Sequence, residues 1–160
     1  MAFAAPSLKS RALRLLAARE YSRTELERKL RPHEEQPGAL AAVLDDLTAK
    51  GFVSEARVVE SLVQRRAGRL GAARIRQELQ AKGIAPEAVA EAVAGLKDSE
   101  LARACKVWRR RFDALPTDAA SRAKQARFLM TRGFGGEVVR RVLAGAGSPD
   151  EDAGPDGEDG

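Results

Sequence analysis

The sequence predicts an all-α protein in which one helical unit is used three times. Three leucines, Leu30, Leu79 and Leu129, anchor short helix-favouring runs and stand 49 and 50 residues apart. Such near-constant spacing indicates a structural repeat. Hydrophobic residues make up 44% of the 160 residues but aromatic residues only 4%, which favours layers of small helices over a thick β core. A charged fraction of 32% agrees with helices that have solvated outer faces.

Turn residues and apolar periodicity divide the chain into three repeats of three helices each. The predicted segments are a flexible N-terminus at residues 1–7, repeats at 8–52, 53–96 and 97–147, and a disordered acidic tail at 148–160. The predicted helices of the first repeat lie at 8–19, 22–31 and 39–50, and those of the second at 54–68, 74–83 and 86–96. The third repeat is predicted to have a long helix that includes Phe112, followed by helices at 118–132 and 136–144. The tail is predicted to be disordered because it has no large apolar residue to bury.

The first repeat contains clear signals for the start and the end of a helix. Ser22, followed by Glu25 three residues later, forms a capping box that predicts the start of the second helix. Pro32 stops this helix, because proline has no amide hydrogen to donate. Gly51 is predicted to turn the chain out of the third helix, with Phe52 packing back onto that helix.

The second repeat places an arginine among apolar residues. Arg66 falls in the middle of the helix face formed by Val58, Val59, Leu62 and Val63. An arginine there must extend its charge to solvent or pair with a carboxylate of a neighbouring helix. We therefore expect a buried or half-buried ion pair; the alternative is an arginine that contacts a ligand.

The long helix of the third repeat has two different faces. Its predicted core stripe consists of Leu101, Cys105, Trp108 and Phe112. Cys105 and Trp108 are therefore interpreted as packing residues, rather than as a nucleophile and a base-stacking residue. On the opposite face, Arg103, Lys106 and Arg110 are predicted to form an exposed basic stripe.

The charge distribution indicates a polyanionic or acidic partner. The formal net charge is +5, but residues 148–160 hold six acidic and no basic residues, so residues 1–147 carry 28 basic and 17 acidic residues, a net charge of +11. Such a body attracts polyanions over a long range. The alternative is a helical protein from a genome that favours arginine codons. The acidic tail either shields the basic body from nucleic acid as an intramolecular competitor or only improves solubility.

The sequence offers no catalytic or metal site. A single cysteine excludes an internal disulfide, and a single histidine, His33, argues against a zinc site. The run Gly133-Phe134-Gly135-Gly136 lacks the Lys-Ser/Thr of a phosphate-binding loop, and the acidic residues form no cluster for a two-metal site. No apolar run reaches membrane-spanning length, and the first residues lack the basic start of a secretory signal. We expect a non-enzymatic monomer in a reducing cytoplasm, without cofactor and without membrane contact.

The basic residues carry the remaining functional signal. Repeated along stacked helices, they suit a phosphate backbone or an acidic protein groove. The candidate contact residues are Arg65, Arg66, Arg69, Arg74, Arg76, Lys82, Arg103, Lys106, Arg110, Lys124, Arg127 and Arg132. A single arginine is more often a solvated surface residue than a contact, so only the pattern is informative. No helix carries the Asn/Gln/Arg cluster of a recognition helix, so we expect weak, non-specific binding to single- and double-stranded DNA.

The central part of the sequence resembles the RecX family of regulatory proteins. The residues similar to the family's central motif are Arg66, Gly71, Arg74-Ile75-Arg76-Gln77-Glu78-Leu79 and Lys82-Gly83-Ile84. Further similar positions are Ser22, Glu25-Leu26, Lys29-Leu30, Gly51-Phe52-Val53, Arg127-Phe128-Leu129 and Arg132-Gly133-Phe134, so the resemblance covers residues 8–145. Two positions depart from it: Ser54-Glu55-Ala56-Arg57-Val58 lacks one acid and an aromatic residue, and Ala72 replaces a proline.

The resemblance implies an elongated, curved array of three tandem three-helix repeats. It also implies a regulator that binds in the groove of the filament that the RecA recombinase forms on DNA, and that inhibits strand exchange, ATP hydrolysis and co-protease activity in DNA repair, homologous recombination and the SOS response. Two alternatives remain. One is a stand-alone helix-turn-helix-like DNA-binding protein, which helix pairs joined at Gly83 and Gly133 would permit, and the other is a helical scaffold for an unrelated acidic protein.

Overall fold

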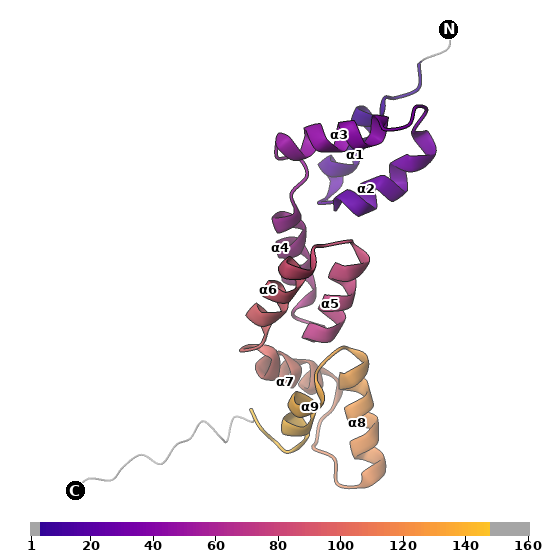
Figure 1. Cartoon of the computed structure of the whole chain (residues 1–160). Helices are drawn as coiled ribbons and strands as arrows, with labels where there is room; N and C mark the ends of the chain where they lie inside the picture. The colour runs from indigo at the N-terminus through magenta and orange to yellow at the C-terminus, as the bar shows by residue number, and fades with distance from the viewer. Residues whose placement is uncertain (1–3, 148–160) are drawn as a thin grey trace, which may run out of the picture. The chain divides into compact units, whose positions relative to one another are not determined.

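The computed structural model describes residues 4–147 and is all-helical within that range (Figure 1). Its α-helices are α1 (Leu8–Ala18), α2 (Arg23–Leu30), α3 (Ala39–Ala49), α4 (Glu55–Arg66), α5 (Ala72–Ala81), α6 (Pro86–Leu96), α7 (Glu100–Arg111), α8 (Ala119–Thr131) and α9 (Gly136–Leu143). A short 3-10 helix, η1 (Arg31–His33), follows α2. The predicted all-α class is confirmed, and each predicted helix is present, although α5 begins before Arg74 and α7 ends at Arg111, one residue before Phe112. The predicted disordered tail, residues 148–160, lies outside the described residues.

The chain divides into two compact units. Unit 1 consists of Met1–Val63 and Glu78–Ala90, and unit 2 consists of Gln64–Gln77 and Glu91–Gly160. The division passes through α4, α5 and α6, so these three helices contribute to both units. Each unit is therefore larger than one sequence repeat, as expected when repeats bury their apolar faces against their neighbours.

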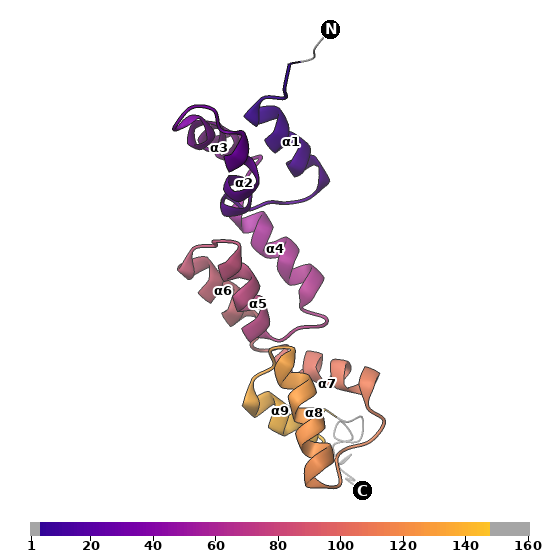
Figure 2. The same cartoon turned by 90° about the vertical axis from the view of Figure 1, so that its right-hand side faces the viewer.

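Unit 1 begins with three helices, α1, α2 and α3, that pack together (Figure 2). The hydroxyl of Ser22 accepts a hydrogen bond from the Glu25 amide at 3.1 Å, and the Glu25 carboxylate accepts one from the Ser22 amide at 3.0 Å. The predicted capping box is therefore confirmed. The buried residues of this core are Ala12, Tyr21, Leu26, Leu30, Leu40, Leu44, Leu47 and Val53.

The turn after α3 corrects one prediction. Gly51 has a φ of 80°, and the amides of Phe52 and Val53 both donate to the carbonyl of Leu47, at 2.9 and 3.3 Å. The Phe52 side chain is 49% exposed, whereas Val53 is only 6% exposed. The prediction that Phe52 packs back onto the helix is wrong, because the left-handed turn directs the following side chain, Val53, into the core.

The core of unit 2 lies between α7, α8 and α9, which pack against one another (Figure 2). Its buried residues are Ala104, Cys105, Val107, Leu129, Phe134, Val139, Val142 and Leu143. Cys105 is buried as predicted, but Trp108 and Phe112 are only half-buried. The indole N–H of Trp108 donates to the side chain of the buried Gln125 at 2.8 Å, and the Gln125 amide group donates to a backbone carbonyl at 3.1 Å. The sequence did not reveal this polar pair, in which each buried group has a partner.

Candidate nucleic-acid interface

The positive charge of the chain is concentrated in unit 2. Among the described residues, unit 1 has 11 basic and 11 acidic residues and no net charge, whereas unit 2 has 17 basic and 6 acidic residues, a net charge of +11. The excess that the sequence shows for residues 1–147 therefore belongs to unit 2. All candidate contact residues except Lys82 lie in this unit.

Several basic residues of unit 1 are held in ion pairs. Arg23 lies 3.2 Å from the Glu27 carboxylate and 2.7 Å from that of Asp45. Arg57 lies 2.9 Å from the Glu20 carboxylate. Nearby opposite charges of this kind cancel at a distance, so unit 1 has little long-range attraction for a polyanion.

The candidate Lys82 belongs to such a paired cluster in unit 1. Its Nζ lies 3.0 Å from Oε2 of Glu25, and its side chain is 18% exposed. Arg19 lies 3.1 Å from the same oxygen. Partial burial by itself would raise the pKa of the Glu25 carboxyl, but hydrogen bonds from the Ser22 amide, Lys82 and Arg19 outweigh it and lower that pKa to about 2. The ammonium group of Lys82 therefore already has a carboxylate partner. Its role as a contact residue stays a prediction.

In unit 2, Arg103 of α7 holds the loop that joins α4 to α5. Its guanidinium donates hydrogen bonds to the carbonyls of Ala67, Leu70 and Leu96, at 2.9, 2.7 and 3.3 Å. Carbonyls at or just after the end of a helix lack intrahelical donors, so a half-buried cation satisfies them well. Burial lowers the pKa of the Arg103 guanidinium, and the charge of Glu100 opposes this effect. The prediction that Arg103 is exposed is wrong, because the α4–α5 loop covers this part of α7.

The end of α4, the same loop and the exposed part of α7 all carry basic side chains. The exposed members are Arg65, Arg66, Arg69, Lys106 and Arg110. Nη1 of Arg110 lies 3.4 Å from the carbonyl of Gly68 in the loop. Lys106 lies on the same face of α7, between Arg103 and Arg110, because residues three and four apart are neighbours on a helix. We call Arg69, Lys106 and Arg110 the loop–α7 patch.

The predicted burial of Arg66 is wrong. Arg66 is the last residue of α4 and is exposed. The amides of Arg69 and Leu70 donate to its carbonyl at 3.0 and 2.9 Å, which closes the helix at this position. Because the helix ends here, its apolar face is not covered as far as Arg66.

Arg74 lies where α5 begins against the turn that follows α8. The amide of Gly71 donates to the carbonyl of Arg132 at 2.8 Å, and the Ala73 amide donates to the carbonyl of Gly133 at 3.2 Å. A Cβ on Gly71 would collide with the backbone of Gly133, so this approach requires glycine. Arg74 is half-buried and donates to a carbonyl at the end of α8 at 3.1 Å. The guanidinium of Arg74 therefore adds to the backbone contact between the start of α5 and the turn after α8.

The remaining candidates fall into two groups. The guanidinium of Arg132 stacks on the ring of Phe128, 3.6 Å from the ring centroid, and donates to the Phe128 carbonyl at 3.2 Å. Arg76, Lys124 and Arg127 are exposed. Like Arg74 and Arg103, the half-buried Arg132 thus has structural contacts.

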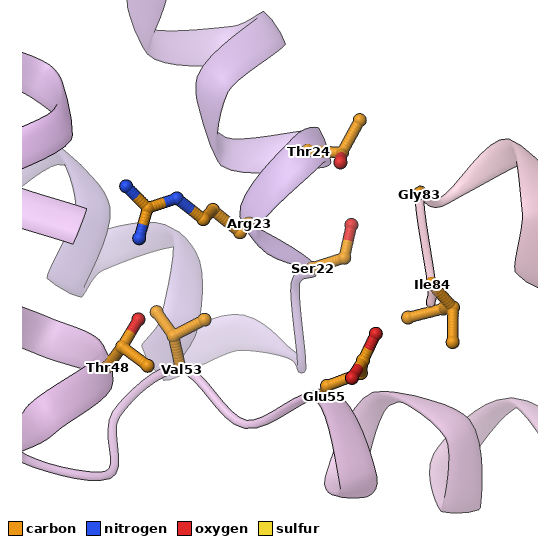
Figure 3. A pocket seen from close by; sticks show the side chains of 8 residues that line it. All are labelled: Ser22, Arg23, Thr24, Thr48, Val53, Glu55, Gly83 and Ile84. Atoms are coloured by element: carbon orange, nitrogen blue, oxygen red, sulfur yellow. The ribbon is translucent and has the colours of Figure 1, made fainter. Parts of the chain in front are cut away.

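Unit 1 contains a pocket of about 300 Å³ (Figure 3). It is lined by Ser22, Arg23, Thr24, Thr48, Val53, Glu55, Gly83 and Ile84. The Glu55 carboxylate accepts a hydrogen bond from the Ala85 amide at 2.7 Å. Gly83 has a φ of 72°, and a Cβ there would collide with the Thr24 side chain. These groups serve packing inside unit 1, so we assign no ligand to the pocket.

Residues 4–147 offer neither a metal site nor a membrane span. No group of three or more His, Cys, Asp and Glu side chains in this part of the chain is arranged to hold a metal ion. None of the described helices combines the length and the apolar character needed to cross a membrane.

The fold and the charges define a class of all-helical repeat protein in which one of two units carries the basic surface. Family models for RecX match the chain in three successive parts: the first three-helix domain at residues 9–47, the second at 54–93 and the third at 98–143. The chain belongs to the RecX family.

Relatives in sequence agree with this assignment, and a solved structure has a similar fold. The chain is 58% identical over 137 residues to "Regulatory protein RecX" of Leptothrix cholodnii, covering 86% of this chain and 87% of that protein. It is 49% identical over 140 residues to the protein of the same name from Ralstonia nicotianae, covering 88% of each. The crystal structure of RecX from Lactobacillus salivarius has a TM-score of 0.73 at 18% identity and covers 87% of this chain and 94% of that chain. At this identity the structural likeness concerns the fold alone.

Proposed function

We propose that this protein is a non-catalytic regulator that binds the filament formed by the RecA recombinase on DNA and inhibits its strand exchange, ATP hydrolysis and co-protease activity. Membership of the RecX family, through matches to all three domains, is the observation that carries the proposal. The regulator acts in the cytoplasm as a monomer and needs no cofactor.

The charge of unit 2 supports a partner that contains nucleic acid. A filament on DNA presents a helical array of phosphates and protein surfaces, so a regulator that lies along it needs repeated contacts and positive charge. The described residues of unit 2 supply a net charge of +11. Contacts from arginine and lysine to phosphates carry no sequence information, so binding to free single- and double-stranded DNA is weak and non-specific.

The effect on ATP hydrolysis is indirect, because the regulator acts by occupying or deforming the filament. A titration of this protein into RecA on single-stranded DNA with ATP tests the proposal. The rate of ATP hydrolysis and the yield of strand exchange should both fall as the regulator is added. The proposal is rejected if both are unchanged at a stoichiometric excess, and sequence-selective binding to duplex DNA without RecA would instead favour the helix-turn-helix alternative.

A further inference from the structure

We infer that the two units divide the binding of the DNA-containing filament between them, so that the loop–α7 patch of unit 2 contacts the DNA phosphate backbone and unit 1 does not. The inference rests on the proposed function, but it concerns DNA contact alone. Its starting point is the net charge of +11 in the described part of unit 2, against zero in the described part of unit 1.

The patch is built on a backbone that is held at both ends. Arg103 fixes the first part of the α4–α5 loop through the carbonyls of Ala67 and Leu70, at 2.9 and 2.7 Å. The Gly71 amide fixes the last part through its 2.8 Å hydrogen bond to the Arg132 carbonyl. A surface whose backbone is already ordered loses less conformational entropy when it binds. The backbone of Arg69, which lies between the anchored carbonyls of Ala67 and Leu70, is therefore ordered before DNA binds.

The composition of the patch fits phosphate better than a protein surface. Protein interfaces have an apolar centre, whereas contacts to a nucleic acid backbone come from arginine and lysine. The exposed large apolar residues in the described part of the chain are Phe52, Leu115 and Met130, and none of them belongs to the α4–α5 loop or to α7. The guanidinium group also offers a planar fork of donors that matches phosphate oxygens.

The inference predicts which residues determine the salt dependence of DNA binding. Each phosphate contact on a single strand adds about 0.7 to the slope of log affinity against log salt concentration. Loss of the three patch residues should therefore reduce this slope by about 2. Loss of three basic residues of unit 1 should leave this slope unchanged, although it lowers the net charge of the protein by the same amount.

A pair of matched triple variants tests this division with the full chain. The first carries Arg69→Gln, Lys106→Gln and Arg110→Gln. The control carries Arg14→Gln, Lys29→Gln and Arg31→Gln, which removes two arginines and one lysine that are exposed in unit 1. Binding of a labelled single-stranded oligonucleotide is measured by fluorescence anisotropy without RecA, between about 50 and 200 mM salt. Thermal unfolding followed by circular dichroism compares the folding of both variants with that of the wild type.

We expect the patch variant to lose about tenfold or more in DNA affinity at the lowest salt and to show the smaller slope, while the control stays within twofold of the wild type. A variant with Arg69→Lys and Arg110→Lys should keep the wild-type slope, because it keeps the charges. This lysine variant preserves the test if the glutamine variant fails to fold, since loss of DNA binding by a folded lysine variant would count against charge as the cause.

Two results would overturn the inference. Equal losses in both triple variants would mean that only net charge matters. Unchanged DNA affinity combined with lost inhibition of RecA would mean that the patch contacts an acidic protein surface. Failure of the proposed function is distinguishable: the wild type would then leave RecA unaffected, while the difference between the two triple variants in DNA binding would persist.

Discussion

Replacing Arg103 with methionine tests whether the half-buried arginines of unit 2 are structural. The substitution keeps most of the side-chain volume and removes every donor. The wild-type guanidinium makes short hydrogen bonds to the carbonyls of Ala67 and Leu70, at 2.9 and 2.7 Å, and longer or more exposed ones to the Leu96 carbonyl and the Ser99 hydroxyl, at 3.3 and 3.0 Å. Hydrogen bonds to a charged group contribute about 1.5–3 kcal/mol each. Because water can reach part of this site, we expect a total loss of about 2–4 kcal/mol in the free energy of unfolding.

Urea denaturation followed by far-ultraviolet circular dichroism measures this loss. Arg110→Met is the matched control, since it makes the same change on the same helix at an exposed residue whose bond to the Gly68 carbonyl is 3.4 Å long. The control should change the free energy of unfolding by no more than about 0.5 kcal/mol. Arg103→Lys should fall between the two, because a single ammonium group cannot reach all the carbonyls. Equal effects of the two methionine variants would refute the structural role of Arg103.

Three further perturbations test other parts of the account. Gly133→Ala should lower the free energy of unfolding by about 2–4 kcal/mol, because Gly133 has a φ of 89° and its new Cβ would lie 2.5 Å from the Arg74 amide nitrogen; Gly135→Ala, at an open position, is the control. The pKa of Glu25 is lowered to about 2, so the stability that its carboxylate contributes is fully present above the unfolded pKa and is lost as the pH falls through about 2. Wild type and Glu25→Gln should therefore differ by about 2–3 kcal/mol in the free energy of unfolding at neutral pH and converge in acid. Parallel curves of stability against pH would contradict this. Deleting residues 148–160, which removes six acidic residues, should raise the affinity for DNA at low salt, and an unchanged affinity would leave only the solubility interpretation.

Apolar periodicity along each segment and short capping and turn signals were sufficient to predict the helices. The capping box of Ser22 and Glu25 needs only four consecutive residues, and the structure contains both of its hydrogen bonds. The side chains after a left-handed glycine are harder to place. Phe52 and Val53 both follow Gly51, and which of them enters the core depends on the hydrogen bonds of the whole turn.

The burial of the arginines could not be predicted from helix periodicity. A helical projection describes one helix and contains no information about what covers each face. Arg66 lies among apolar positions yet is exposed, because α4 ends there. Arg103 lies on the polar face of α7 yet is half-buried, because carbonyls of the α4–α5 loop reach it. The α4–α5 loop could have indicated a partner such as Arg103, because the backbone carbonyls of a loop need donors from elsewhere in the chain.

The division into two units was also hidden from local patterns. Gly71 and Gly133 lie far apart in the sequence, and no local pattern around either glycine indicates that their backbones are in contact. The repeat spacing indicates three equivalent segments, whereas the compact units share the three middle helices. The concentration of charge in unit 2 becomes visible only once these units are known.

Cosedimentation with RecA filaments tests the central claim most directly. Filaments are assembled on single-stranded DNA with a slowly hydrolysed ATP analogue, pelleted, and compared with DNA alone and with RecA alone. The account predicts that the protein pellets with the filaments in a saturable amount, and in far smaller amounts with DNA alone or RecA alone. Protein that stays in the supernatant at every ratio, under salt conditions in which the filament is intact, would contradict it.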